Sequence, residues 1–140
     1  MRQPISVLAD YLHLARGALR RRQPLVRDRA LLLAGVIAAQ IDLEPIAGGC
    51  RAKILTRNPR HLVRRWPTIG QALADEEFQV LINQLSTRYG PERVEQLVKQ
   101  LGISDEINPT NFASEGEYAA ALLDMSWDEL VRRFGADFEE

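Results

Sequence analysis

Residues 30–39 read ALLLAGVIAA, a run of ten uncharged residues between Arg29 and Gln40. The run is too short to cross a bilayer, which takes about 20 apolar residues in a helix. It lies within a longer segment, residues 25–40, that is apolar nearly all round at helical spacing. A helix of this kind belongs at the centre of a bundle, so the segment predicts a buried central helix.

The segments on both sides of the central helix also have helical spacing. Residues 5–19 carry one apolar stripe, which should end before Pro24. Residues 43–57 are expected to form a third helix, with Asp42 as its N-cap. Runs of β-branched residues, which strands favour, are missing from the chain.

The stretch RHLVRRW, residues 60–66, follows an Asn-Pro pair at 58–59 that is typical of a helix start. We expect a short helix here, ended by the next proline. Such a helix would bury Leu62, Val63 and Trp66 while its cationic side chains point outward.

Two strongly amphipathic segments follow, over residues 75–89 and 91–101, and they meet at Gly90. We expect these two helices to form an antiparallel hairpin. Gly102 should end the second helix in a left-handed conformation, with Ile103 making the hydrophobic contact that accompanies such an end.

Residues 104–113, SDEINPTNFA, break the helical periodicity and are rich in turn formers. Two Ser-x-x-Glu capping boxes follow at 114–117 and 126–129. They predict helices at about 115–124 and 127–134.

Length and composition indicate one cytoplasmic globular domain. A chain of 140 residues that is 46% hydrophobic and 26% charged has ordinary globular values. The single cysteine cannot form an intramolecular disulfide, and the first residues do not resemble a secretory signal. We therefore expect one all-α domain over residues 1–140, a compact bundle-like array of about six or seven helices without a membrane span. Its weakest seam should lie at 104–113.

The two halves of the chain carry opposite charge. Residues 1–70 contain 13 Lys or Arg and 4 Asp or Glu, a balance of +9, whereas residues 71–140 contain 5 and 15, a balance of −10. Arginine outnumbers lysine by 16 to 2, which favours bidentate contacts to carboxylate or phosphate, although codon usage in a GC-rich genome would have the same effect. The residues expected to bind a phosphate or an acidic partner are Arg16, Arg20, Arg57, Arg60, Arg64 and Arg65.

The positive charge of the basic half could be neutralised in several ways. The acidic half could neutralise it within one molecule or in a homo-oligomer, and an acidic protein partner could do the same. We therefore expect a non-catalytic protein–protein interaction or regulatory module. The alternative is a nucleic-acid-binding accessory protein, against which the acidic half counts because it would repel a polyanion.

An enzyme with Cys50 as nucleophile is a third hypothesis, raised by the stretch AGGCRAK at 47–53, where cations flank the thiol. Such a nucleophile would need His13 or His61 as base, and neither lies in a recognisable pattern. We instead expect a buried Cys50, with the two preceding glycines allowing close approach of the central helix. No motif for a cofactor, a metal or another catalytic set is present, so we expect none of these.

Overall fold

The computed structural model describes residues 3–102 and 108–135, and every regular element in these stretches is a helix. The all-α class predicted from the sequence is confirmed. The described residues form eight α-helices and two 3₁₀ helices: α1 (Pro4–Arg20), α2 (Pro24–Gln40), α3 (Glu44–Arg57), η1 (Leu62–Arg65), α4 (Ile69–Ala72), α5 (Glu76–Arg88), α6 (Pro91–Leu101), η2 (Pro109–Asn111), α7 (Glu115–Leu122) and α8 (Trp127–Phe134).

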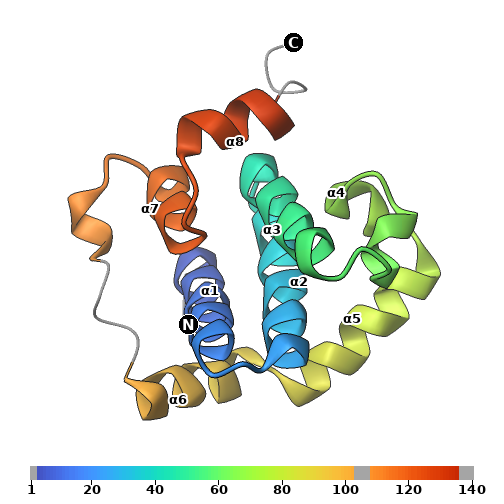
Figure 1. The fold of residues 1–140 in the computed structure, drawn as a ribbon, viewed down its shortest axis with the longest axis horizontal. Coiled ribbons are helices and arrows are strands. Elements are labelled where there is room, and N and C mark those ends of the chain that lie inside the picture. Colours follow the sequence, from blue (N-terminus) through green and yellow to red (C-terminus); the bar gives the residue numbers. More distant parts are fainter. Residues whose placement is uncertain (1–2, 103–107, 136–140) are drawn as a thin grey trace.

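The centre of the molecule is α2, which packs against α1 on one side and α3 on the other (Figure 1). Ala30, Ala34 and Ala38 recur along α2 at intervals of four residues and are at most 1% exposed. Such short side chains let neighbouring helices approach closely. The predicted buried central helix is therefore confirmed. No helix in the described residues is long and apolar enough to span a bilayer.

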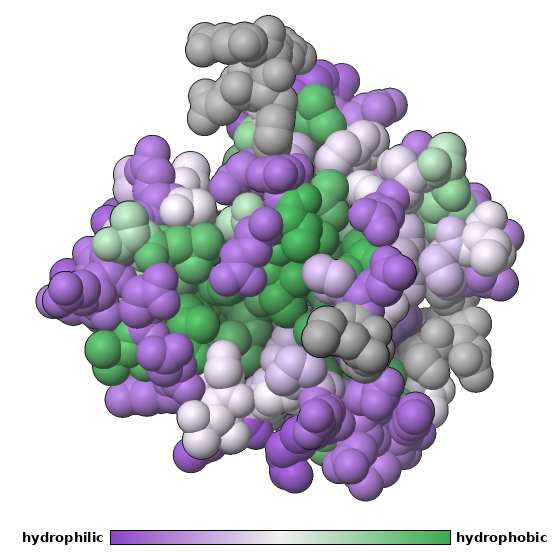
Figure 2. Space-filling model, turned by 180° about the vertical axis from the view of Figure 1, so that it is seen from behind, coloured by the Kyte–Doolittle hydropathy of each residue, from purple (hydrophilic) through white to green (hydrophobic). Residues whose placement is uncertain are grey.

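The C-terminal half of the chain surrounds these three central helices. Helices α6 and α7 pack on α1, α8 packs on α3, and α4 and α5 pack on α2 (Figure 1). From behind, hydrophobic residues are visible across the middle of the face, with hydrophilic residues around them (Figure 2). The shell therefore leaves some of the apolar interior visible from this side.

Helices α5 and α6 do not form the expected antiparallel hairpin. They meet at Gly90, but α5 turns its apolar stripe to α2 and α6 turns its stripe to α1. The Tyr11 hydroxyl of α1 donates a hydrogen bond to the Tyr89 carbonyl at the junction. The prediction was wrong because each stripe already has a central helix to pack against.

The end of α6 follows the sequence prediction. Gly102 has a φ of +64°, the left-handed conformation that glycine adopts without a Cβ clash, and its N–H bonds the Val98 carbonyl. The contact expected of Ile103 lies outside the described residues, as do residues 104–107 of the expected loop. Within the rest of that loop, η2 forms a single 3₁₀ turn.

The RHLVRRW stretch forms a 3₁₀ turn rather than an α-helix. Its start is capped by His61, whose Nδ1 accepts a 3.0 Å hydrogen bond from the Val63 N–H. Only four residues are left between this cap and the extended Trp66, too few to develop an α-helix. Val63 and Trp66 are buried as predicted, whereas Leu62 remains 42% exposed.

The predicted serine caps are confirmed, and the predicted aspartate cap is not. Ser114 and Ser126 each accept a hydrogen bond from the backbone N–H three residues later, at 3.1 and 3.4 Å. Asp42 instead has a φ of +62° at the end of α2, and the N-cap of α3 is Leu43. Asp42 therefore terminates one helix instead of capping the next.

The glycines of α3 accommodate α8 and not α2. A methyl group on Gly48 would lie 2.3 Å from the Cγ of Phe134, and one on Gly49 would lie 2.8 Å from a methyl group of Leu130. The sequence prediction paired these glycines with the wrong helix. On α2 the close approaches are made by Gly35, where a methyl group would lie 2.4 Å from the Cδ1 of Ile69 in α4 and 3.3 Å from the Cβ of Cys50 in α3.

Candidate functional site

A groove lies where the end of α1, the start of α2, the end of α3 and the α7–α8 connection meet. It consists of two hollows of about 510 Å³ each, and Leu19, Arg27 and Arg57 line both. We call the continuous depression the basic groove. Its charged lining residues are the cations Arg22, Arg27, Lys53, Arg57 and Arg133 and the acids Asp124 and Glu129.

Arg27 is a buried cation in the wall of this groove, only 6% exposed. Its guanidinium donates 3.3 Å hydrogen bonds to the Asp28 carboxylate and to the Lys53 carbonyl. Burial lowers the pKa of Arg27, the charge of Asp28 raises it, and the nearby Arg57 lowers it further. Because arginine starts from such a high pKa, the side chain stays charged at neutral pH.

Neighbouring positive charges also affect the pKa of Lys53. Burial is the main cause that lowers this pKa, the charge of Asp124 raises it, and the charges of Arg27 and Arg16 lower it further. Among the described residues, none forms an ion pair with Arg22, Lys53 or Arg57. The groove therefore holds more positive charge than the fold itself neutralises.

The six predicted binding arginines lie in several different places in the structure. Arg57 lines the basic groove. Arg16 donates to the Asp124 carboxylate at 2.8 Å and to the Leu122 carbonyl at 3.2 Å, so it ties α1 to the end of α7. Arg65 lies 2.7 Å from Glu77 and stacks over the Trp66 ring at 5.3 Å. The other three are exposed and lie outside the groove lining: Arg20, Arg60 and Arg64.

Sequence reasoning did not select Arg22, Arg27, Lys53 or Arg133. One signal was present, because Arg27 and Asp28 are adjacent charges at the start of the otherwise apolar central helix. Charges buried in such a helix need partners, and these two pair with each other at 3.3 Å. Nothing local marks the other three, since they reach the groove from different helices and from the α1–α2 turn.

Cys50 is fully buried, and burial raises the pKa of its thiol to about 12. The thiol is therefore protonated at neutral pH, the reverse of an activated nucleophile. His61 is engaged in capping η1, and His13 is 4% exposed on α1. In the described part of the chain, no three His, Cys, Asp or Glu side chains are grouped as metal ligands would be.

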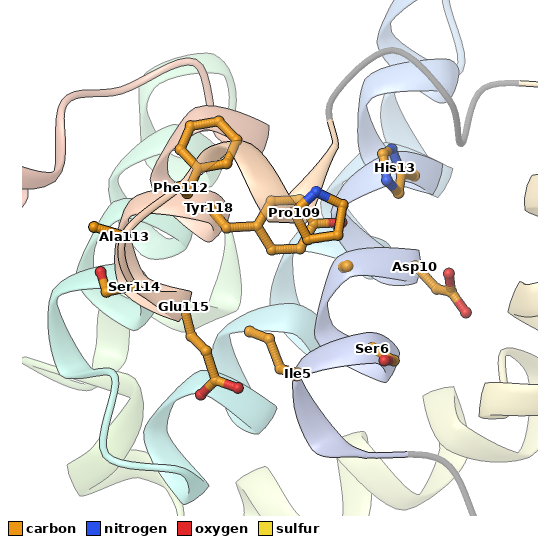
Figure 3. Close-up of a pocket in the computed structure, with 11 residues that line it drawn as sticks. Ile5, Ser6, Asp10, His13, Pro109, Phe112, Ala113, Ser114, Glu115 and Tyr118 are labelled. Atoms are coloured by element: carbon orange, nitrogen blue, oxygen red, sulfur yellow. The ribbon is translucent and has the colours of Figure 1, made fainter.

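A second hollow, of about 530 Å³, lies between the N-terminal half of α1 and the η2–α7 segment (Figure 3). We call it the aromatic pocket, because Phe112 and Tyr118 line it with ring centroids 5.9 Å apart and planes tilted by 42°. Asp10 and His13 of α1 lie on its other side. Its described lining residues are Ile5, Ser6, Ala9, Asp10, His13, Pro109, Phe112, Ala113, Ser114, Glu115 and Tyr118.

No protein-family model, curated protein or solved structure matches the chain. We therefore infer what the molecule can bind from the basic groove and the aromatic pocket. One is rich in cations, and among the described residues that line the other there is no Lys or Arg.

Proposed function

We propose that the protein is a non-catalytic interaction module whose basic groove binds an acidic segment of a protein partner. One observation carries the proposal: Arg22, Lys53 and Arg57 border the groove without an ion pair to any described residue, beside the buried Arg27. Cations held close together repel one another, and burial removes some of the hydration of Arg27 and Lys53. Carboxylates seated among them would relieve both costs through charge-assisted hydrogen bonds.

The acids in the groove favour a short acidic segment over a nucleic acid. Asp124 and Glu129 line the same hollow as Lys53, and a continuous phosphate backbone would pass close to both carboxylates. A peptide can place its carboxylates at the cations and leave neutral residues beside the acids. A second copy of the chain could supply such a segment, since residues 71–140 carry a balance of −10.

The test uses a fluorescent eight-residue peptide of alternating Glu and Ser, with a Gln/Ser peptide of the same length as control. Fluorescence anisotropy should detect binding of the acidic peptide only, and the binding should weaken as salt rises. The double variant Lys53→Gln/Arg57→Gln should weaken binding by about tenfold, since two charge-assisted contacts are lost.

The matched control removes two cations of the same basic half that lie outside the groove lining, in the double variant Arg60→Gln/Arg64→Gln. It should reduce affinity by less than about threefold, through net charge alone. Equal losses in both double variants would refute the groove as the binding site. Tighter binding of a mixed-sequence DNA or RNA duplex than of the peptide, with a steep salt dependence, would favour the nucleic-acid alternative.

Sedimentation at low and high salt shows whether the partner is a second copy. A dimer at low salt that dissociates at high salt, and that Lys53→Gln/Arg57→Gln abolishes, would identify the acidic segment as the chain's own. A monomer at both salt concentrations, together with peptide binding, would point to a different protein.

A further inference from the structure

The aromatic pocket is distinct from the basic groove in its charge. Among its described lining residues, the charged ones are Asp10 and Glu115, both negative. None of the chain's 18 Lys and Arg residues is among the described residues that line it. In Figure 3, Asp10 and Glu115 lie on either side of Ile5 and Tyr118.

The aromatic rings add a second feature that favours positive charge. Phe112 is half-buried and Tyr118 is 9% exposed, and both line the hollow. The face of an aromatic ring carries partial negative charge and attracts ammonium and guanidinium groups. Burial raises the pKa of Tyr118, and the negative charge of Asp10 raises it further, so the field of Asp10 reaches this ring.

An anion is a poor fit for the same hollow. The start of α7 would favour negative charge, but the Glu117 N–H there already has a partner in its own chain. The Ser114 hydroxyl accepts a hydrogen bond from the Glu117 N–H at 3.1 Å. Glu115 and Glu117 also lie in the first turn, where their charges offset the helix dipole.

We propose that the aromatic pocket binds a small organic cation, an amine or quaternary ammonium compound with an apolar body. A hollow of about 530 Å³ is within the usual size of small-molecule sites, which combine an apolar lining with a few polar groups. The rings and the Glu115 carboxylate would hold the cationic group, with the negative charge of Asp10 adding to the field, while Ile5, Ala9 and Pro109 would cover the apolar part. Among the described residues, none lines both this site and the basic groove, so the two proposals can be tested independently.

A charge series on one ring system tests the proposal. Benzyltrimethylammonium, benzyl alcohol and benzoate are titrated against the full chain by isothermal titration calorimetry. The ammonium compound should bind at least about tenfold more tightly than the alcohol, from cation–π attraction and the carboxylates together. Benzoate should bind least. Equal binding of all three probes, or no binding of the ammonium compound at millimolar concentration, would overturn the proposal.

Variants locate the binding. Phe112→Ala should weaken binding of benzyltrimethylammonium by about fivefold or more, through loss of one ring face. Asp10→Asn and Glu115→Gln should each weaken binding of the ammonium compound while leaving the affinity for benzyl alcohol unchanged. Glu115 is exposed, so Glu115→Gln tests the charge even if Asp10→Asn disturbs α1.

Glu76→Gln is the matched control, because Glu76 is an exposed first-turn acid of α5 outside the pocket lining. It should leave the affinity for benzyltrimethylammonium unchanged. A loss as large as that of Glu115→Gln would mean that net charge alone drives the binding, and would refute the site.

Discussion

The guanidinium of Arg16 donates a 2.8 Å hydrogen bond to the carboxylate of Asp124, 108 residues further along the chain. Arg65 and Glu77, 2.7 Å apart, make a second contact of the same kind. Both join the basic half of the chain to the acidic half. The opposite charges of the two halves are therefore partly neutralised inside one molecule, whereas Arg22, Lys53 and Arg57 of the basic groove form no ion pair with any described residue.

Asp124→Asn should strengthen binding of the acidic peptide to the basic groove. The carboxylate of Asp124 lines the groove and raises the pKa of Lys53, so its removal leaves the groove more positive. Asparagine tolerates the left-handed conformation of this residue, which has a φ of +58°. Peptide affinity, measured by anisotropy, should rise by about threefold. Urea unfolding should show a loss of less than about 1 kcal/mol, as for other exposed pairs.

The control is Asp128→Asn, which makes the same change in net charge on α8 but outside the groove lining. It should alter peptide affinity much less. A weaker binding of the peptide by Asp124→Asn would contradict the assignment of the groove as an anion site.

Trp66→Phe should raise the pKa of Asp75 toward its ordinary value. The indole N–H of Trp66 donates a 3.0 Å hydrogen bond to Asp75, and this bond is the main cause of the lowered pKa of that carboxyl group. Phenylalanine can keep the edge-on contact with Phe78, whose ring centroid lies 5.0 Å away, but it has no donor. An NMR titration of the Asp75 carboxyl carbon measures the change directly.

The sign of the accompanying pH effect follows from linkage. A lowered carboxyl pKa adds stability above the unfolded pKa, and that stability is lost as pH falls through the folded pKa. The stability difference between wild type and Trp66→Phe should therefore shrink as pH falls from 7 to 3. An unchanged Asp75 titration in the variant would show that the indole bond is not the cause.

Gly48→Ala should destabilise the packing of α8 on α3. The added methyl group would lie 2.3 Å from the Cγ and 2.7 Å from the Cβ of Phe134, so the ring and its helix must move. Overpacking of this kind costs about 1–3 kcal/mol, seen as a lower urea midpoint at unchanged slope.

Gly90→Ala serves as the control for Gly48→Ala, because its methyl group would meet only the Ser86 carbonyl at 3.3 Å and its φ of −63° suits any residue. It should change the unfolding free energy by about 0.5 kcal/mol or less. Similar losses in both variants would show that glycine replacement, rather than the contact with Phe134, sets the cost.

The helices of this protein could be predicted because their signals are local. Ser114 and Ser126 cap helices through N–H groups three residues away, and Gly102 ends α6 within its own turn. The burial of α2 follows from its apolar composition alone. These features depend on neighbours in the sequence, so they do not require knowledge of the tertiary arrangement.

The packing partners of each helix could not be predicted in the same way. The apolar stripes of α5 and α6 are compatible with a hairpin and also with packing on α2 and α1, and only the complete fold selects between the two. Gly48 indicates that another helix approaches closely, but the residues around it in the sequence do not identify that helix. The basic groove could not be predicted for the same reason, since Arg22, Lys53 and Arg133 lie on three separate segments that the fold brings together.

Cys50 should resist alkylation in the native state and should make the fold less stable at high pH. A free thiol has a pKa of about 8.5 in an unfolded chain, whereas burial raises the pKa of Cys50 to about 12. Between these values the unfolded chain releases a proton that the folded chain keeps, so stability falls as pH rises, by at most about 1.4 kcal/mol per pH unit. Urea unfolding at pH 8, 9 and 10 should show this fall, and Cys50→Ala should show a shallower one because the buried tyrosines still contribute.

Iodoacetamide at neutral pH should modify the wild type only as fast as it unfolds. Rapid modification of the folded protein would contradict the burial of the thiol and favour the nucleophile hypothesis.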